Sequence, residues 1–354
     1  MALTKSFPRV ASVPARVRRQ TARAALRARA AAVTKSDTVA VVGATGNVGR
    51  LVALRLADLG YSVRALVRDT DKAEGALARD GIERVQADVV KGSQDELAEA
   101  LKGCSAVVMT TGVSAFPSSA WGDISLNLGA AGGLKQKIQF SNPPEKVDAE
   151  GPRKVVEAWA AANPGKAAKK RFVLMSSVGV TRRDAMPYKM LNGAGVLDCK
   201  AAGEAAVMAT AEAEGFEFTI VRPGQLFGGP YESAVYLGAL FELDKEAGTG
   251  RVVMEKGDTI VGDTLRSTLA EVCAAAVASK GAANLDFVVV NEKGDAPSEA
   301  ELSALLDALP GTEARSEPQG PRIELFAETL AQASGKVGTA VNKLSDSFTN
   351  TKDD

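Results

Sequence analysis

The feature that most constrains this chain is a glycine-rich turn directly after a short apolar run. Residues 38–42 are mostly β-branched and apolar, which is typical of a strand buried on both faces of a parallel sheet. Gly43 lets the chain reverse, Gly46 lets backbone approach a pyrophosphate, and Gly49 lets the next helix pack closely on the strand. The sequence therefore predicts a phosphate-binding turn at a helix N-terminus. We expect its cofactor contacts to come from Gly43, Thr45, Gly46, Asn47, Val48 and Gly49.

The N-terminal segment, residues 1–36, has the composition of an organelle transit peptide. It holds nine of the 43 Lys and Arg residues and no Asp or Glu. A basic arm that binds nucleic acid is the alternative. Acidic residues outnumber basic ones by nine in the rest of the chain, so we expect no nucleic-acid partner. Composition of this kind is common to chloroplast and mitochondrial transit peptides, so both locations stay open at this point.

The composition also excludes several kinds of chemistry. The chain has no histidine, which rules out Ser-His-Asp hydrolysis, Cys-His catalysis and histidine-ligated metals. Cys104, Cys199 and Cys273 are scattered, so neither a disulfide framework nor a zinc site is expected. No run of about 18 apolar residues is present, and we expect no transmembrane segment. Proton transfer must then use Tyr, Lys, Ser or a carboxylate.

Strand and helix patterns alternate along most of the chain, with helices predicted at 147–162 and from about 196 to 214. This alternation predicts an α/β fold with a doubly wound parallel sheet, the Rossmann arrangement. A C-terminal part with weaker patterns, including short strands at 252–254 and 287–290, should close over the nicotinamide end and shape a substrate pocket. Residues 113–146 form a polar connection long enough to be a lid or an insert. The predicted domains are a transit peptide (1–36), the NAD(P)-binding domain (37–309), a linker (310–321) and a helical tail (322–354).

Several strand ends carry polar side chains that suit a dinucleotide. Arg68 favours NADP because a cation there accommodates the extra phosphate, although Asp69 offers the ribose contact of an NAD site. Asp88, followed by Val89, is either an acceptor for the adenine amino group or a solvated loop residue. Thr110, Thr111 and Gly112 end the fourth strand, at the crevice where an open parallel sheet binds its ligand.

The tail has apolar residues at steps of three and four from Ile323 to Phe348, which predicts a long amphipathic helix. It either docks on its own domain or binds a partner. Its polar face mixes Glu, Lys and Asp, so a protein partner is favoured over anionic lipid.

Taken together, these segments resemble the atypical short-chain dehydrogenase/reductases, and among them the plant and algal plastid branch of NAD(P)-binding Rossmann-fold, or NmrA-like, proteins. Members of that group include reductases, an import-translocon-associated dehydrogenase and assembly or translation factors of the photosystems. The resemblance implies a chloroplast location, in the stroma or on the thylakoid, with the mitochondrion as the alternative. The resemblance covers residues 38–290. It is carried by the glycine turn, Arg68, Asp88, Ser176-Ser177, residues 195–200 with Glu204, residues 219–224, and Arg266 with residues 270–272. It implies cofactor contacts from Ser176, Lys200, Pro223 and Gly224.

The resemblance also implies a catalytic Tyr four residues before a Lys, with a Ser that orients the carbonyl. Lys200 and Ser176 match, but Val196 stands at the tyrosine position. Tyr188 lies near the spacing expected after the serines, and a flexible glycine-rich loop can bring it inward. The expected catalytic residues are Lys200, Ser176 and Tyr188.

Two functions follow from this sequence. The first is an oxidoreductase that uses NADP, or else NAD, on a small-molecule carbonyl, quinone or conjugated substrate. Quinone or flavin acceptors are favoured because their reduction depends less on proton donation by a protein acid than reduction of a ketone does. The second is a non-catalytic NADP(H)-binding redox sensor, or an assembly or scaffold factor of a plastid complex that binds a protein partner through the tail helix.

Overall fold

The computed structural model describes residues 33–113, 124–127, 137–165, 170–186, 188–228 and 248–312. Their main sheet has ten strands, and seven of these run parallel in the order β3-β2-β1-β4-β7-β8-β12. The seven are β1 (Thr38–Val42), β2 (Ser62–Val67), β3 (Ile82–Gln86), β4 (Cys104–Met109), β7 (Arg171–Met175), β8 (Glu217–Pro223) and β12 (Leu285–Glu292). This order confirms the predicted doubly wound sheet. The order in which the chain adds strands reverses between β1 and β4, and sheets of this kind bind their ligands at that point.

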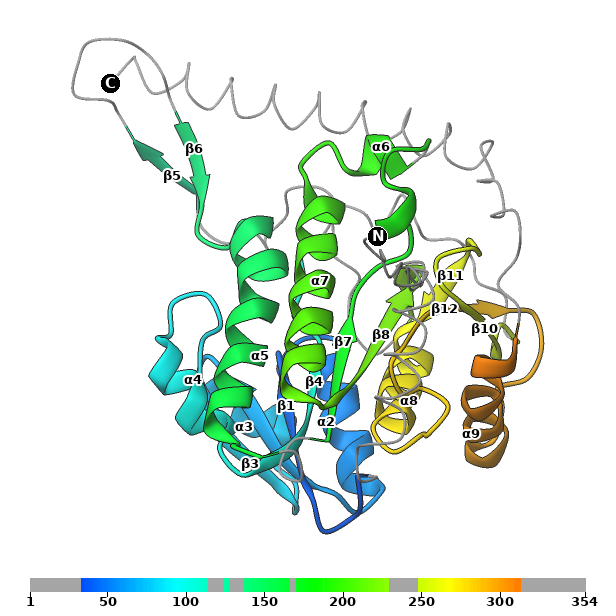
Figure 1. Ribbon diagram of the computed structural model, residues 1–354, viewed down its shortest axis with the longest axis horizontal. Helices are drawn as coiled ribbons and strands as arrows, with labels where there is room; N and C mark the ends of the chain where they lie inside the picture. The colour runs from blue at the N-terminus through cyan, green and yellow to red at the C-terminus, as the bar shows by residue number, and fades with distance from the viewer. Residues whose placement is uncertain are drawn as a thin grey trace, which may run out of the picture.

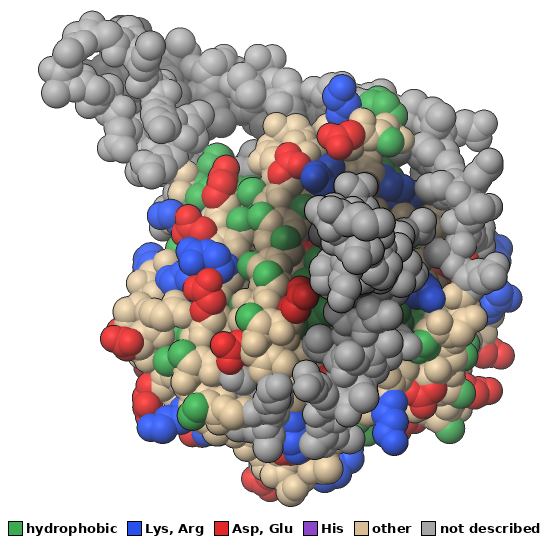
Figure 2. All heavy atoms as spheres, viewed as in Figure 1, with side chains coloured by type: hydrophobic (Ala, Val, Ile, Leu, Met, Phe, Trp, Pro, Cys, Tyr) green, Lys and Arg blue, Asp and Glu red, His purple; other side chains and the backbone are tan. Residues whose placement is uncertain are grey.

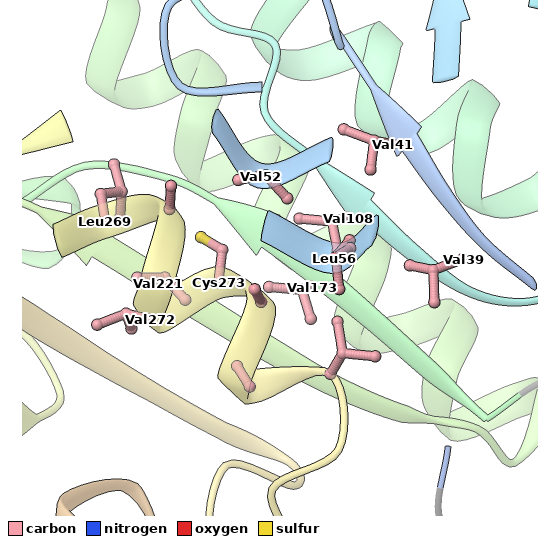
Figure 3. Close-up of a cluster of buried hydrophobic side chains, with 14 of the residues drawn as sticks. Val39, Val41, Val52, Leu56, Val108, Val173, Val221, Leu269, Val272 and Cys273 are labelled. Carbon is pink, nitrogen blue, oxygen red and sulfur yellow. The ribbon is translucent and has the colours of Figure 1, made fainter. Parts of the chain in front are cut away.

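Each central strand buries both of its faces, and the side chains alternate between two cores. On β1, Val39 and Val41 join one cluster, whereas Ala40 and Val42 join the other. Figure 3 shows the first cluster, in which Val39 and Val41 lie near Val52 and Leu56 of a covering helix. The apolar run that begins the chain's fold is therefore a fully buried central strand, as its composition predicts.

Helices cover both faces of the sheet (Figure 1). One layer holds α2 (Gly49–Asp58), α3 (Thr70–Leu77), α8 (Arg266–Ala276) and α9 (Glu299–Ala308). The other holds α4 (Gln94–Leu101), α5 (Gly151–Ala162) and α7 (Val196–Glu214). A π-helical turn, Glu145–Glu150, leads into α5, so the predicted helix 147–162 contains a change of helix type. α6 (Tyr188–Leu191) is a single turn before α7.

The C-terminal part adds strands that the sequence patterns only partly predict. β10 (Arg251–Lys256) and β11 (Asp263–Leu265) pair antiparallel with β12, and β9 (Gln225–Phe227) pairs parallel with β11. β10 and β12 match the weak strand patterns at 252–254 and 287–290. Strands β9 and β11 were not predicted, and neither was the small hairpin of β5 (Ile124–Asn127) and β6 (Lys137–Phe140), which lies in the predicted long connection.

The ends of the predicted domain are only partly within the described residues. Val33 packs in the core although it lies in the predicted transit segment, and Leu309–Gly311 form a short 3-10 turn. Residues 1–32, most of the predicted linker and the whole tail lie outside the described residues, so the predicted boundaries stay predictions. No helix in the described ranges is long and apolar enough to cross a membrane. Acidic and basic side chains are intermixed on the face shown in Figure 2.

Candidate functional site

The glycine turn between β1 and α2 has the local geometry that an anion site requires. Gly43 has φ +83°, in the left-handed region, and its carbonyl accepts a hydrogen bond of 2.9 Å from the Gly46 N–H. A Cβ on Gly49 would overlap the Gly43 carbonyl oxygen and lie 2.6 Å from Thr110 Oγ1. The close packing predicted for Gly49 is therefore present.

The first turn of α2 carries no side chain that would compete with a bound anion. The residue before the helix, Val48, makes no side-chain capping hydrogen bond, and the first turn holds no acidic residue. Thr45, Gly46 and Asn47 are exposed on the turn itself. Free N–H groups and the positive end of the helix dipole together favour a bound phosphate. These residues fit the pyrophosphate of a dinucleotide.

Two buried hydroxyl groups without partners lie at the carboxyl ends of neighbouring strands. Thr111 follows β4 and Ser176 follows β7, and the two strands are paired. Neither Thr111 Oγ1 nor Ser176 Oγ has a hydrogen-bond partner among the described residues. An unsatisfied buried polar group costs about 1–3 kcal/mol, so a hydrogen bond to a bound ligand or to a water would stabilise these two hydroxyls. By contrast, Thr110 Oγ1 donates to the Val42 carbonyl at 2.9 Å and ties β4 to β1.

The Lys200 side chain extends from α7 toward the carboxyl ends of these strands. Its ammonium group donates to Asp148 Oδ1 at 2.6 Å, and the side chains of Lys200 and Asp148 are 10% and 2% exposed. The other carboxylate oxygen of Asp148 accepts the Val113 N–H at 3.2 Å. A Cβ on Gly112 would lie 3.0 Å from Lys200 Nζ, which places the ammonium over the end of β4.

Tyr188 is buried in a different environment. It packs with Val180 and Leu197, and its hydroxyl accepts a hydrogen bond of 3.0 Å from Arg182, which also pairs with Asp258. Burial and the charge of Asp258 raise the pKa of Tyr188 to about 12, although Arg182 lowers it. These contacts hold the hydroxyl against Arg182, and the catalytic role of Tyr188 stays a prediction.

The residues predicted to bind the adenosine half follow β2 and β3. Arg68 is exposed directly after β2, and Asp69 is half-buried beside it. Asp88 Oδ1 accepts the N–H groups of Val90 and Lys91 at 2.8 and 3.2 Å, so one carboxylate oxygen stabilises its own turn. The described contacts give the second oxygen no such bond, and the adenine contact of Asp88 stays a prediction. Val89 is buried beside it.

Pro223 and Gly224 end β8, and their contacts are with neighbouring strands. Gly224 N–H donates to Thr264 Oγ1 at 2.8 Å, and a Cβ on Gly224 would overlap the carbonyl group of Gly262. The carbonyl of Pro223 accepts the Val178 N–H at 2.9 Å. Close approach of two backbones explains the glycine. Cofactor contacts by Pro223 and Gly224 stay a prediction.

Two residues named by the resemblance form a buried ion pair. Arg222 binds the Glu204 carboxylate through two nitrogens at 2.9 and 2.6 Å, and it also donates to Asp286 at 2.6 Å. Burial alone lowers the pKa of Arg222, but the hydrogen bonds to Glu204 raise it overall. This pair therefore joins α7, β8 and β12 within the core.

The sequence patterns did not identify Asp148 or Asp258 as important. Asp148 lies near the start of a predicted helix, where an acidic residue is ordinary. Asp258 is fully buried in the loop after β10 and accepts the N–H groups of Gly179 and Thr181 at 2.9 Å. Within the described residues, no cluster of three metal-ligating side chains is present, and all three cysteines are buried free thiols.

Curated proteins related to this chain include plastid and bacterial proteins. The chloroplastic protein TIC 62 of Pisum sativum is 31% identical over 56% of this chain, and the chain spans only 37% of that protein. The chloroplastic protein At2g34460 of Arabidopsis thaliana is 30% identical, with 69% of this chain and 72% of that protein covered. The sugar epimerase YhfK of Bacillus subtilis, itself uncharacterized, is 28% identical over 75% of this chain and 99% of its own length.

Solved structures agree on the fold. The oxidoreductase ylbE of Lactococcus lactis superimposes with a TM-score of 0.51 at 18% identity, covering 79% of this chain and all of that one. The yeast reductase Gre2 gives a TM-score of 0.50 at 13% identity, covering 85% and 99%. Residues 43–280 match the protein family described as NAD(P)H-binding. The chain, with its atypical short-chain dehydrogenase/reductase architecture, therefore belongs to the NAD(P)H-binding family.

Proposed function

We propose that this protein is an NADP(H)-dependent oxidoreductase that reduces a quinone or a conjugated carbonyl compound. The observation that supports it is the set of polar groups at the ends of β4 and β7. The buried hydroxyls of Thr111 and Ser176 have no hydrogen-bond partner in the part of the chain that the structure describes, and the Lys200 ammonium lies over Gly112. Buried donors that converge at the crevice of a parallel sheet are suited to a ligand rather than to the fold alone.

Each group has a role in holding the cofactor. The Gly43–Gly49 turn would bind the pyrophosphate through backbone N–H groups. Lys200 and Thr111 would bind the ribose next to the nicotinamide, and Ser176 would orient the carbonyl of the substrate. NADPH supplies a hydride to the acceptor when it is bound. The protein contributes position and charge, because the Lys200 ammonium stabilises negative charge that develops on a nearby oxygen.

The class of acceptor follows from a missing acid. Val196 is buried and stands four residues before Lys200, where a valine cannot transfer a proton. A quinone or a conjugated carbonyl spreads the charge of the reduced form over several atoms. Reduction of such an acceptor depends less on proton donation by a protein acid than reduction of a simple ketone does.

The choice of NADP over NAD rests on Arg68. Its side chain is exposed at the end of β2, where the adenosine ribose lies in this type of fold. A guanidinium group can bind the additional phosphate of NADP through two parallel hydrogen bonds. Asp69 is the competing contact and would favour NAD instead.

The proposed location is the chloroplast. Residues 1–36 have the composition of a transit peptide, and two of the related proteins, from pea and Arabidopsis, are chloroplastic. Import of the full chain into isolated chloroplasts, compared with mitochondria, tests this assignment. Processing by mitochondria alone would contradict it.

A second function is favoured by the position of Tyr188. Its hydroxyl is bound to Arg182, and Val196 replaces the usual tyrosine, so no phenol is among the hydrogen-bond partners of Lys200 in the described part of the chain. A protein of this kind can bind NADP(H) as a redox sensor or scaffold without any turnover. Its partner would then contact the predicted tail helix, which lies outside the described residues.

One experiment separates these functions. The full chain is titrated with NADPH and NADH by fluorescence, and loss of nicotinamide absorbance is then followed with quinone and enone acceptors. We expect tighter binding of NADPH and an oxidation that Lys200→Met abolishes. Lys189→Met, which changes an exposed lysine on α6, is the matched control and should behave as wild type. Binding without oxidation by any acceptor supports the sensor, and absence of binding refutes both functions.

A further inference from the structure

We infer that Asp148 is a positioning residue, whose carboxylate holds the Lys200 ammonium at the end of β4 in the place that a bound cofactor requires. The inference rests on the proposed binding of NADP(H). It assigns a role to a residue that stands 52 positions before its partner and outside the sequence motifs.

The carboxylate of Asp148 is fixed from both sides. Oδ2 accepts the Val113 N–H, so it is tied to the backbone just beyond β4, and Oδ1 accepts from Lys200 Nζ. An ammonium group has three N–H donors, and the described contacts of Lys200 use one of them. The contact with Asp148 thereby fixes the position of a flexible lysine side chain, and the remaining N–H groups of its ammonium can donate to a ligand.

The backbone around Asp148 is built for this approach. Asp148 lies in the π-helical turn before α5, and such turns are frequent at functional sites. On α7, a Cβ at Gly203 would overlap the Asp148 carbonyl oxygen and lie 3.0 Å from Pro152 Cγ. Glycine is unfavourable inside a helix. Its presence one turn after Lys200 is explained by the close approach of the turn that carries Asp148.

A second buried pair on the same helix shows the difference between holding the fold and preparing a site. Glu204, one turn beyond Lys200, binds Arg222, which uses three nitrogens on two carboxylates. This pair lies between α7 and the core strands β8 and β12. The Lys200 pair instead adjoins Gly112, next to Thr111, whose hydroxyl has no partner among the described residues. The Lys200–Asp148 pair therefore lies beside an unused hydroxyl, whereas all three side-chain nitrogens of Arg222 are taken up by carboxylates.

The test is a double-mutant cycle on NADPH affinity in the full chain, with Asp148→Asn, Lys200→Met and the double variant. We expect each single change to weaken binding about tenfold or more, and the double variant to bind no more weakly than Lys200→Met, because Asp148 acts through Lys200. The inference would be overturned if the losses of NADPH affinity in the two single variants multiply in the double variant, or if Asp148→Asn binds NADPH as the wild type does. Asp198→Asn, which alters an exposed acid on α7 paired with Arg183, is the control and should bind NADPH normally.

Weaker NADPH binding must be traced to a displaced Lys200 ammonium and not to an unfolded variant. Thermal unfolding without nucleotide checks each variant, and Gly112→Ala provides a second route because its new methyl group crowds Lys200 Nζ without removing a charge. We expect severalfold weaker NADPH binding and an unchanged melting temperature. Unchanged affinity in Gly112→Ala counts against the inference even if Asp148→Asn fails to fold. Wild-type protein that binds NADPH but never oxidises it refutes only the oxidoreductase proposal, whereas wild-type protein that does not bind NADPH overturns both.

Discussion

A single methyl group added at Gly49 is expected to separate α2 from the end of β1. The Cβ of an alanine there would overlap the Gly43 carbonyl oxygen and lie 2.8 Å from its carbon, and both are backbone atoms that cannot rotate away. Overpacking of this kind costs about 1–3 kcal/mol. The better helix propensity of alanine offsets at most about 1 kcal/mol. We therefore expect Gly49→Ala to destabilise the protein by about 2 kcal/mol.

This change is measured by thermal unfolding with and without NADPH. A loss of about 2 kcal/mol lowers the melting temperature of a domain of this size by about 4–8 °C. Saturating ligand stabilises a binding protein by about 2.7 kcal/mol at a hundredfold excess over Kd. Because the turn that holds the pyrophosphate is displaced, Gly49→Ala should also lose most of this NADPH-dependent shift.

The matched control is Gly75→Ala in α3. A Cβ there meets nothing within 4 Å, so the substitution should stabilise the protein by about 0.5–1 kcal/mol and leave the NADPH shift intact. The reasoning is refuted if Gly49→Ala melts and binds NADPH as wild type does. It is also refuted if both variants lose stability equally, since the cost would then not arise from the contact with Gly43.

Three further predictions concern single side chains. Arg68→Ala should weaken NADPH binding about tenfold and leave NADH binding nearly unchanged, as fluorescence titration will show, because only NADPH carries the phosphate. Tyr188→Phe should keep any NADPH oxidation within about twofold of wild type while losing about 1 kcal/mol of stability, whereas a catalytic phenol would cost a hundredfold or more in rate. Burial raises the pKa of Asp37, but hydrogen bonds from Lys170, Thr34 and Ser105 outweigh it and lower the pKa to about 2. Since the folded pKa lies below the unfolded value near 4, the stability from Asp37 is complete at neutral pH and falls to about half by pH 3. Urea unfolding should therefore show a larger deficit for Asp37→Asn at pH 7 than at pH 3, and an equal deficit at both would contradict this.

The parts of the fold that were predictable depend on local patterns. Buried parallel strands need continuous apolar runs, and helices between them need apolar residues every three or four positions, so β1 and α7 were found with bounds close to those observed. Strands β9 and β11 are three residues long and exist because they pair with each other and extend the sheet. A run that short carries no period of its own, and only its neighbours make it a strand.

The candidate site divides in the same way. The glycine turn was predictable from residues 43–49 alone, because left-handed backbone and close helix packing are local demands that only glycine meets, and Lys200 and Ser176 were found by resemblance. Their surroundings were not predictable and depend on the folded chain. In the described residues Lys200 binds Asp148, the hydroxyls of Thr111 and Ser176 have no partner, and the Tyr188 hydroxyl binds Arg182. A buried ion pair or an unsatisfied hydroxyl depends on which strand ends and helix faces meet in space, and residues far apart in the chain carry no local signal of that meeting.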